Sequence, residues 1–124
     1  MNIPNYLQYT EDHEWIKIDN GIATVGITDY AQSELGDIIF IELPDIGVLC
    51  NKKDSIGTIE AVKTVADIFS PVSGEISKIN TNLEDRPESV NSDPYGNGWI
   101  VQLSNINLND NSFLSAEEYK ELIQ

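Results

Sequence analysis

Residues 57–71 have the sequence GTIEAVKTVADIFSP, in which two short apolar runs meet at Lys63. Valine, isoleucine, threonine and phenylalanine favour strands, so the pattern predicts a β-hairpin with Lys63 at its tip. Lys63 is the only basic residue of the stretch, and acidic residues flank it at Glu60 and Asp67. A lysine at a hairpin tip points into solvent, where another protein can reach it. We therefore interpret Lys63 as a modification site that the rest of the chain presents.

Length and charge narrow the classes of protein to consider. The 124 residues predict a single domain over 1–124, with a core over about residues 9–103 and a C-terminal helix over about residues 115–123. The formal net charge is −14, from 21 acidic and 7 basic residues. This balance excludes binding to nucleic acids or anionic membranes, which requires a basic surface. It favours steering toward basic surfaces of partner proteins.

The cysteine and histidine content argues against metal sites and disulfides. Cys50 is the only cysteine and His13 the only histidine, so an internal disulfide is impossible and no metal site is expected. A reducing compartment fits a single cysteine best. The first residues lack both the basic and apolar regions of a secretory signal and the arginines of a transit peptide. These features predict a bacterial cytoplasmic protein rather than a matured mitochondrial one.

Strand signals recur along most of the chain. The Asn20-Gly21 pair suits a type I′ turn between two strands of a hairpin. Short apolar or alternating segments bounded by turn residues predict strands over 15–18, 22–27, 37–43, 48–50, 56–62, 65–69, 75–80 and 99–103.

Two helices are predicted from their end signals. Thr28 can cap the start of a short helix over residues 28–36, and Gly36 suits the position after its last turn. Ser115 and Glu118 have the spacing of a capping box at the start of the C-terminal helix.

The remaining segments are less regular. The continuous apolar run within 37–43 predicts a strand buried on both faces. Residues 1–8 are expected to form a leader of uncertain order, residues 81–92 a polar segment with a helical turn after Pro87, and residues 105–111 an asparagine-rich loop. Many short strands with a few small helices predict a mainly β fold, a flattened β-barrel or sandwich with helical additions.

The motif around Lys63 resembles the lipoyl-lysine region of the glycine cleavage H-protein family. The similarity is carried by DSIGTIEAVK at 54–63 and DIFSPVSGE at 67–75. It extends from about Tyr9 to Ile123. Further matching motifs are HEW (13–15), GITDYA (26–31), LGDI (35–38), PESVN (87–91), DPYG (93–96), GW (98–99) and LSAEEY (114–119). Cys50 departs from the aliphatic residue usual in related patterns, although a thiol has similar bulk.

The resemblance implies a fold and a function. The fold would be of the lipoyl-domain, or barrel-sandwich hybrid, type, and Lys63 would carry lipoate in amide linkage. The chain would be a non-catalytic carrier that takes the aminomethyl group of glycine from the P protein to the T protein and electrons to the L protein. Its other partner would be the enzyme that attaches lipoate, and we expect a monomer that docks transiently.

Acidic residues are candidates for shielding the loaded arm. The aminomethyl amine is cationic, so nearby carboxylates would hold it. Glu14 and Asp67 are the first candidates, followed by Asp12 and Glu60. The alternative is that these residues only contribute to the acidic surface.

Three other functions differ from this one in the motifs that they require. A biotinyl carrier uses a similar hairpin, but it typically has methionine on both sides of the lysine, where this chain has Val62 and Thr64. A lipoyl relay that donates lipoate to 2-oxoacid dehydrogenases keeps the same motif and stays an alternative. A hydrolase with paired carboxylates has no supporting motif.

Overall fold

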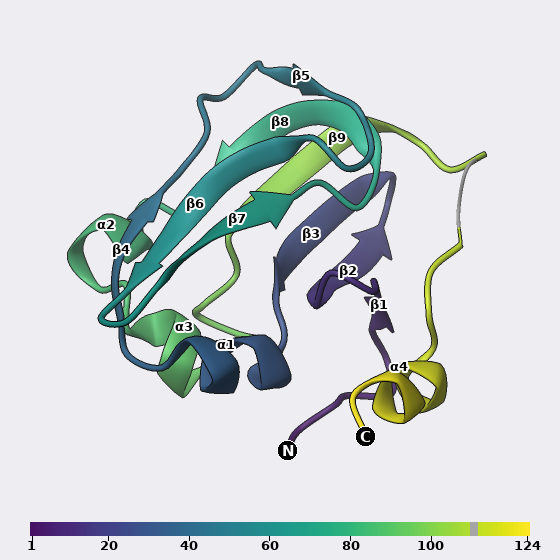
Figure 1. Cartoon of the computed structure of the whole chain (residues 1–124). Helices are drawn as coiled ribbons and strands as arrows, with labels where there is room; N and C mark the ends of the chain where they lie inside the picture. The colour runs from purple at the N-terminus through teal and green to yellow at the C-terminus, as the bar shows by residue number, and fades with distance from the viewer. Residues whose placement is uncertain (110–111) are drawn as a thin grey trace.

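The structure is a computed structural model that describes residues 1–109 and 112–124. The described residues form two antiparallel sheets (Figure 1). In spatial order, one sheet contains β1 (Gln8–Tyr9), β2 (Glu14–Asp19), β3 (Ile22–Ile27), β9 (Val101–Asn107), β8 (Ser73–Ile79) and β5 (Leu49–Cys50). The other contains β4 (Ile38–Glu42), β6 (Ser55–Ala61) and β7 (Val65–Phe69). The helices are α1 (Asp29–Leu35), α2 (Asn82–Asp85), α3 (Ser89–Ser92) and α4 (Ala116–Leu122).

The two sheets share one hydrophobic core. Ile41, Ile59 and Ile68 of the three-stranded sheet belong to the same buried cluster as Val25 and Leu103 of the larger sheet. Each of these side chains is no more than 2% exposed. Full burial of such a side chain contributes roughly 1.5–3 kcal/mol, so packing between the sheets is a major source of stability. The mainly β, sandwich-like fold class predicted from the sequence is confirmed.

Local end signals produced the predicted turn and helices. Asn20 and Gly21 both have positive φ angles, 51° and 77°, as a type I′ turn requires. The Thr28 hydroxyl accepts a hydrogen bond from the amide of Ala31 and caps α1. The capping box is also confirmed, because Ser115 and Glu118 bond each other's backbone amides at the start of α4.

Strand β4 corrects one prediction. Only Ile38 and Ile41 of this strand face the core, whereas Ile39 is 56% and Phe40 48% exposed. A register irregularity lies between Ile38 and Phe40, and β4 is an edge strand of a sheet that packs on one side only. The prediction of burial on both faces was therefore wrong.

The limits of three other segments also differ from the predictions. Residues 1–8 are not a loose leader, because Ile3 and Leu7 are buried. The segment 81–92 forms α2, which was not predicted, as well as the expected turn after Pro87, which is α3. Strand β9 continues to Asn107, where a loop was predicted; the end of that predicted loop, residues 110–111, lies outside the described residues.

A second buried cluster joins both ends of the chain. Tyr9 stacks on Tyr119 of α4 with ring centroids 4.8 Å apart, and Trp15 packs in the same cluster. The indole of Trp15 lies directly on Gly26, where a Cβ atom would be 2.6 Å from its Nε1 atom. Only glycine therefore fits at position 26. The indole N–H donates to the carbonyl of Pro94 at 3.0 Å.

Candidate functional site

Lys63 lies at the tip of the hairpin formed by β6 and β7, with its side chain exposed. The turn is closed by a hydrogen bond of 2.8 Å from the amide of Ala61 to the carbonyl of Thr64. The amide of Val62 donates to the carbonyl of Asp37 at 3.0 Å, which ties the tip to the segment after α1. The lysine is thus presented on a backbone that is fixed from two sides.

Gly36 makes room for the side chain of Lys63. It follows α1 with a φ angle of +78°, a conformation that glycine adopts at little cost. A Cβ atom at this position would lie 3.3 Å from Cε and 3.7 Å from Nζ of Lys63. The lysine side chain therefore lies against the end of α1 instead of extending straight away from the hairpin.

A hollow of about 290 Å³ lies beside this end of α1. It is bounded by the loop before β2, by one side of α1 and by β6 and β7. Its wall combines apolar and ionisable side chains: Ile27, Ala31, Leu35, Ile59, Ala66, Asp12, His13, Glu14, Tyr30, Glu34 and Asp67. An apolar hollow with a few ionisable groups suits an aliphatic ligand that carries a charge.

Glu14 is the buried carboxyl group of this hollow. Its side chain is 2% exposed, and the hydroxyl of Thr10 donates to Oε1 at 2.7 Å. Burial raises the pKa of Glu14 to about 7, against the opposing effect of the Thr10 hydrogen bond. A cation placed beside Glu14 would supply the missing counter-charge and favour its ionised form.

The other three predicted acids lie in different settings. Asp12 and Asp67 line the hollow together with Glu14. Asp12 also pairs with Nζ of Lys53 at 2.8 Å, so part of its charge is already balanced. Glu60 is exposed between the inward-facing Ile59 and Ala61 and therefore lies on the outer face of the three-stranded sheet.

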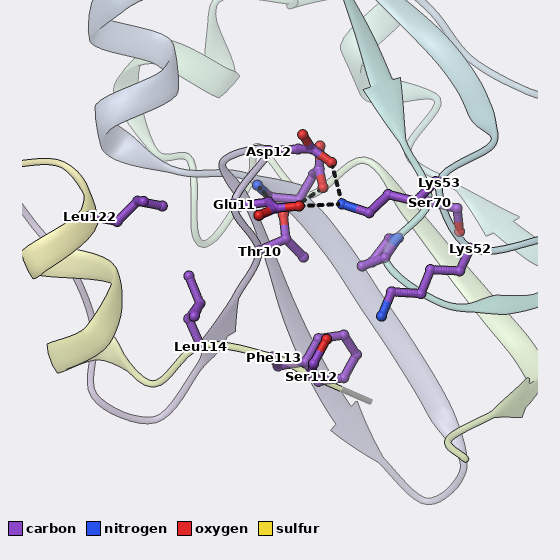
Figure 2. A pocket seen from close by; sticks show the side chains of 12 residues that line it. Thr10, Glu11, Asp12, Lys52, Lys53, Ser70, Ser112, Phe113, Leu114 and Leu122 are labelled. Atoms are coloured by element: carbon purple, nitrogen blue, oxygen red, sulfur yellow. Dashed lines mark hydrogen bonds and ion pairs between the residues drawn. The ribbon is translucent and has the colours of Figure 1, made fainter. Parts of the chain in front are cut away.

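Figure 2 shows the Lys53 contacts in a neighbouring hollow of about 200 Å³. Nζ of Lys53 bridges Asp12 and, at 3.3 Å, Glu11. Lys53 has a φ angle of +77°, and its amide donates to the carbonyl of Ser70 at 2.7 Å. The ion pair links the loop before β2 to this turn, although exposed pairs of this kind contribute at most about 1 kcal/mol.

A hydrogen-bond network around Tyr119 supports the wall of the hollow that contains His13. The hydroxyl of Tyr119 lies 2.8 Å from Nδ1 of His13 and 2.7 Å from the hydroxyl of Thr28. The ring of His13 also contacts Tyr30, with centroids 5.0 Å apart. Burial lowers the pKa of His13, against the effects of Asp12 and Glu34, so its neutral form is favoured.

Sequence reasoning did not identify His13, Tyr30 or Glu34 as residues of this site. Tyr30 and Glu34 are four positions apart on α1 and so lie on one face of the helix. That spacing could have indicated a shared wall. No local signal links His13 to Tyr119, because 106 positions separate them.

Comparison with known proteins identifies the family. Residues 7–124 match the family described as glycine cleavage H-protein. The chain belongs to this family. It is 48% identical over 124 residues to the glycine cleavage system H protein of Listeria monocytogenes serotype 4a, covering 99% of both chains. It is 49% identical over 122 residues to that of Listeria welshimeri, covering 98% of both.

A solved structure agrees with this assignment. The crystal structure of a glycine cleavage system H protein from Mycobacterium marinum superposes with a TM-score of 0.88 at 38% identity. The match covers 96% of this chain and 97% of the other. Membership of the H-protein family gives the chain the role of lipoyl carrier in the glycine cleavage system.

The described residues 1–109 and 112–124 contain neither a helix suited to crossing a membrane nor a side-chain cluster suited to a metal ion. No helix there is long and apolar enough to cross a membrane. No group of three or more histidine, cysteine or acidic residues there has the arrangement of a metal site.

The raised pKa of Glu14 predicts a pH-dependent stability. In the unfolded chain this carboxyl ionises near its ordinary value of 4.5, whereas in the folded protein it keeps its proton until about pH 7. The folded state therefore binds more protons in this window, and stability must fall as pH rises through it. The expected loss is roughly 3–4 kcal/mol, at about 1.4 kcal/mol per pKa unit. Denaturant unfolding at pH values across the window measures it, with Glu14→Gln as reference. Equal pH profiles for the two proteins would contradict the prediction.

The contact between Gly36 and Lys63 predicts a selective effect of Gly36→Ala. Alanine at a positive φ angle costs roughly 1–2 kcal/mol, and here it would also push the lysine side chain away from α1. Gly21→Ala is the matched control, because Gly21 has a φ angle of +77° and nothing within 4 Å of a Cβ atom. We expect both variants to lose stability, but only Gly36→Ala to lose the proton NMR cross-peaks between residue 36 and the Lys63 methylene groups. Loss of those cross-peaks in Gly21→Ala would refute the contact.

Proposed function

We propose that Lys63 carries lipoate in amide linkage and that the chain is the aminomethyl carrier of the glycine cleavage system. The observation that carries this proposal is the exposed amine on a fixed turn, next to a hollow with a buried carboxyl group. When attached, the dithiolane supplies the sulfur atoms that bind the aminomethyl group and carry electrons. The chain's own residues present the amine, hold the cargo and limit its contact with water.

The hollow offers the attached group both apolar and charged contacts. Leu35, Ile59 and Ala66 offer apolar contacts to an aliphatic chain. Glu14 and Asp67 offer carboxyl groups to a cationic amine, and a charge-assisted hydrogen bond contributes about 1.5–3 kcal/mol. Glu14 is the main candidate because burial strengthens its interaction with a cation. Asp12 is weaker because Lys53 already pairs with it.

The proposed partners follow from this carrier role. The chain would dock transiently and as a monomer with the P, T and L proteins and with the enzyme that attaches lipoate. We assign no catalytic residue to it, because the roles proposed for Lys63 and the acids are attachment and retention. A free, buried Cys50 fits the reducing bacterial cytoplasm. No specific contact favours the relay role over this one.

Replacement of Lys63 tests the attachment site. Lys63→Arg keeps the positive charge but removes the primary amine that forms the amide bond. Expression with lipoate and an active attaching enzyme should give the mass of the lipoyl adduct for the wild type and the unmodified mass for Lys63→Arg. Lys78→Arg controls for substitution of another lysine and should retain the adduct. An adduct on Lys63→Arg, or none on the wild type, would reject the assignment.

Replacement of Glu14 tests cargo retention. Glu14→Gln keeps the side-chain volume but cannot become an anion, so loss of the aminomethyl group from the loaded protein should become about tenfold faster, as expected for a charge-assisted hydrogen bond. Glu60→Gln, on the outer face of the sheet, should leave the rate within about twofold of the wild type. The measurement is the release of ammonia and formaldehyde from loaded protein over time. Equal rates for Glu14→Gln and the wild type would exclude the proposed role of Glu14.

A further inference from the structure

Four exposed apolar side chains surround the hairpin tip. Ile39 and Phe40 of β4 are 56% and 48% exposed, and Val62 and Val65 beside Lys63 are 72% and 61% exposed. We call these four residues the tip cluster. Two of them, Ile39 and Phe40, belong to the apolar run of β4 for which the sequence predicted burial on both faces. The protein itself covers only one face of that strand. Clustered exposed apolar residues mark interaction surfaces in soluble proteins.

The register of the three-stranded sheet makes the tip cluster continuous. Phe40 is opposite Glu60, and Glu60 is opposite Val65, so these three side chains form one row across β4, β6 and β7. Directly opposed side chains on one sheet face are within contact distance of each other. Val62, the residue before Lys63, is also exposed and lies beyond this row at the tip. Figure 1 shows the three strands as one layer that ends at the tip.

We propose that the tip cluster is the docking surface for the enzyme that attaches lipoate to Lys63; this rests on the lipoyl-carrier function proposed above. Attachment requires the Lys63 amine itself to enter an active site, which brings the residues next to it into contact with that enzyme. Enzymes that act on the dithiolane end of an attached lipoyl group do not need to contact the hairpin itself. Among the proposed partners, the attaching enzyme therefore has the strongest need for this surface.

The reaction itself requires this close approach. The unprotonated Nζ atom of Lys63 attacks the carbonyl carbon of an activated lipoyl donor, either a mixed anhydride or a thioester. A C–N bond forms, and the bond from the carbonyl carbon to the leaving group breaks. The leaving group departs with that electron pair, and the proton released from nitrogen passes to a base. No electron is gained or lost by the protein.

Charge defines the chemistry of the partner surface. Glu60 stands within the row of Phe40 and Val65, and Glu42 follows on the same face, in a chain of net charge −14. The complementary surface therefore combines apolar contacts to Phe40 and Val65 with basic groups opposite Glu60 and Glu42. Such an interface loses affinity as salt screens its charges.

Paired substitutions test the docking surface. The double variant Phe40→Ser/Val65→Ser removes apolar area from exposed positions, so the fold should be retained and circular dichroism can check it. The matched control is Ile46→Ser/Leu49→Ser, which removes two side chains that are 63% and 77% exposed. Leu49 lies on β5, away from the tip in Figure 1.

The measurement is the rate of lipoyl attachment by a purified lipoate-attaching enzyme, with the concentration of carrier varied. We expect the KM of the tip variant to rise about tenfold, which corresponds to about 1.4 kcal/mol, with kcat within twofold of the wild type. The control pair should match the wild type, and Phe40→Leu/Val65→Leu should restore attachment. Fully lipoylated tip variant whose lipoyl group has first been reduced to the dithiol should be reoxidised by a dihydrolipoyl dehydrogenase, with NAD+ as electron acceptor, at the wild-type rate.

Each contrary result has a distinct meaning. Unchanged attachment to the tip variant, an equal loss in the control pair, or an equal loss in the reoxidation assay would overturn the docking proposal while leaving lipoylation intact. A wild type that gains no lipoyl mass at Lys63 would reject the proposed function and the docking proposal together.

Discussion

The hydrogen bond from the amide of Val62 to the carbonyl of Asp37 fixes the relation between the lysine turn and α1. Gly36, next to this contact, leaves space for the side chain of Lys63. Leu35, one position earlier, already lines the acidic hollow. The point of attachment and the proposed resting place of the cargo therefore belong to one rigid unit. Loop motion is not required to bring them together.

The hollow is supported from the far side by the C-terminal helix. Tyr119 combines a ring stack on Tyr9 with hydroxyl contacts to His13 and Thr28. Because these contacts are largely buried, they contribute more to the position of the wall than the exposed pair between Lys53 and Asp12 does. A helix distant from Lys63 along the chain thus helps to set the shape of the site.

The buried carboxyl group of Glu14 suits a cationic cargo that is present during only part of the carrier's cycle. Its pKa of about 7 means that this buried carboxyl group need not carry a full negative charge at neutral pH before the cargo arrives. Arrival of a cationic amine would favour ionisation and create a charge-assisted pair at that moment. Asp67, which is exposed, would interact with the same cation more weakly.

The sequence alone determined the hairpin around Lys63, the Asn20-Gly21 turn and the caps of α1 and α4, because these features depend on residues a few positions apart. It also named Glu14 and Asp67 as candidates for shielding the loaded arm, from the positive charge of the cargo. Only the tertiary structure decided that Glu14 is buried and that His13 meets Tyr119, since burial and long-range contacts depend on how the sheets pack. The exposure of the apolar residues of β4 was decided in the same way: an apolar run has the same sequence whether its second face is covered by the chain or left open.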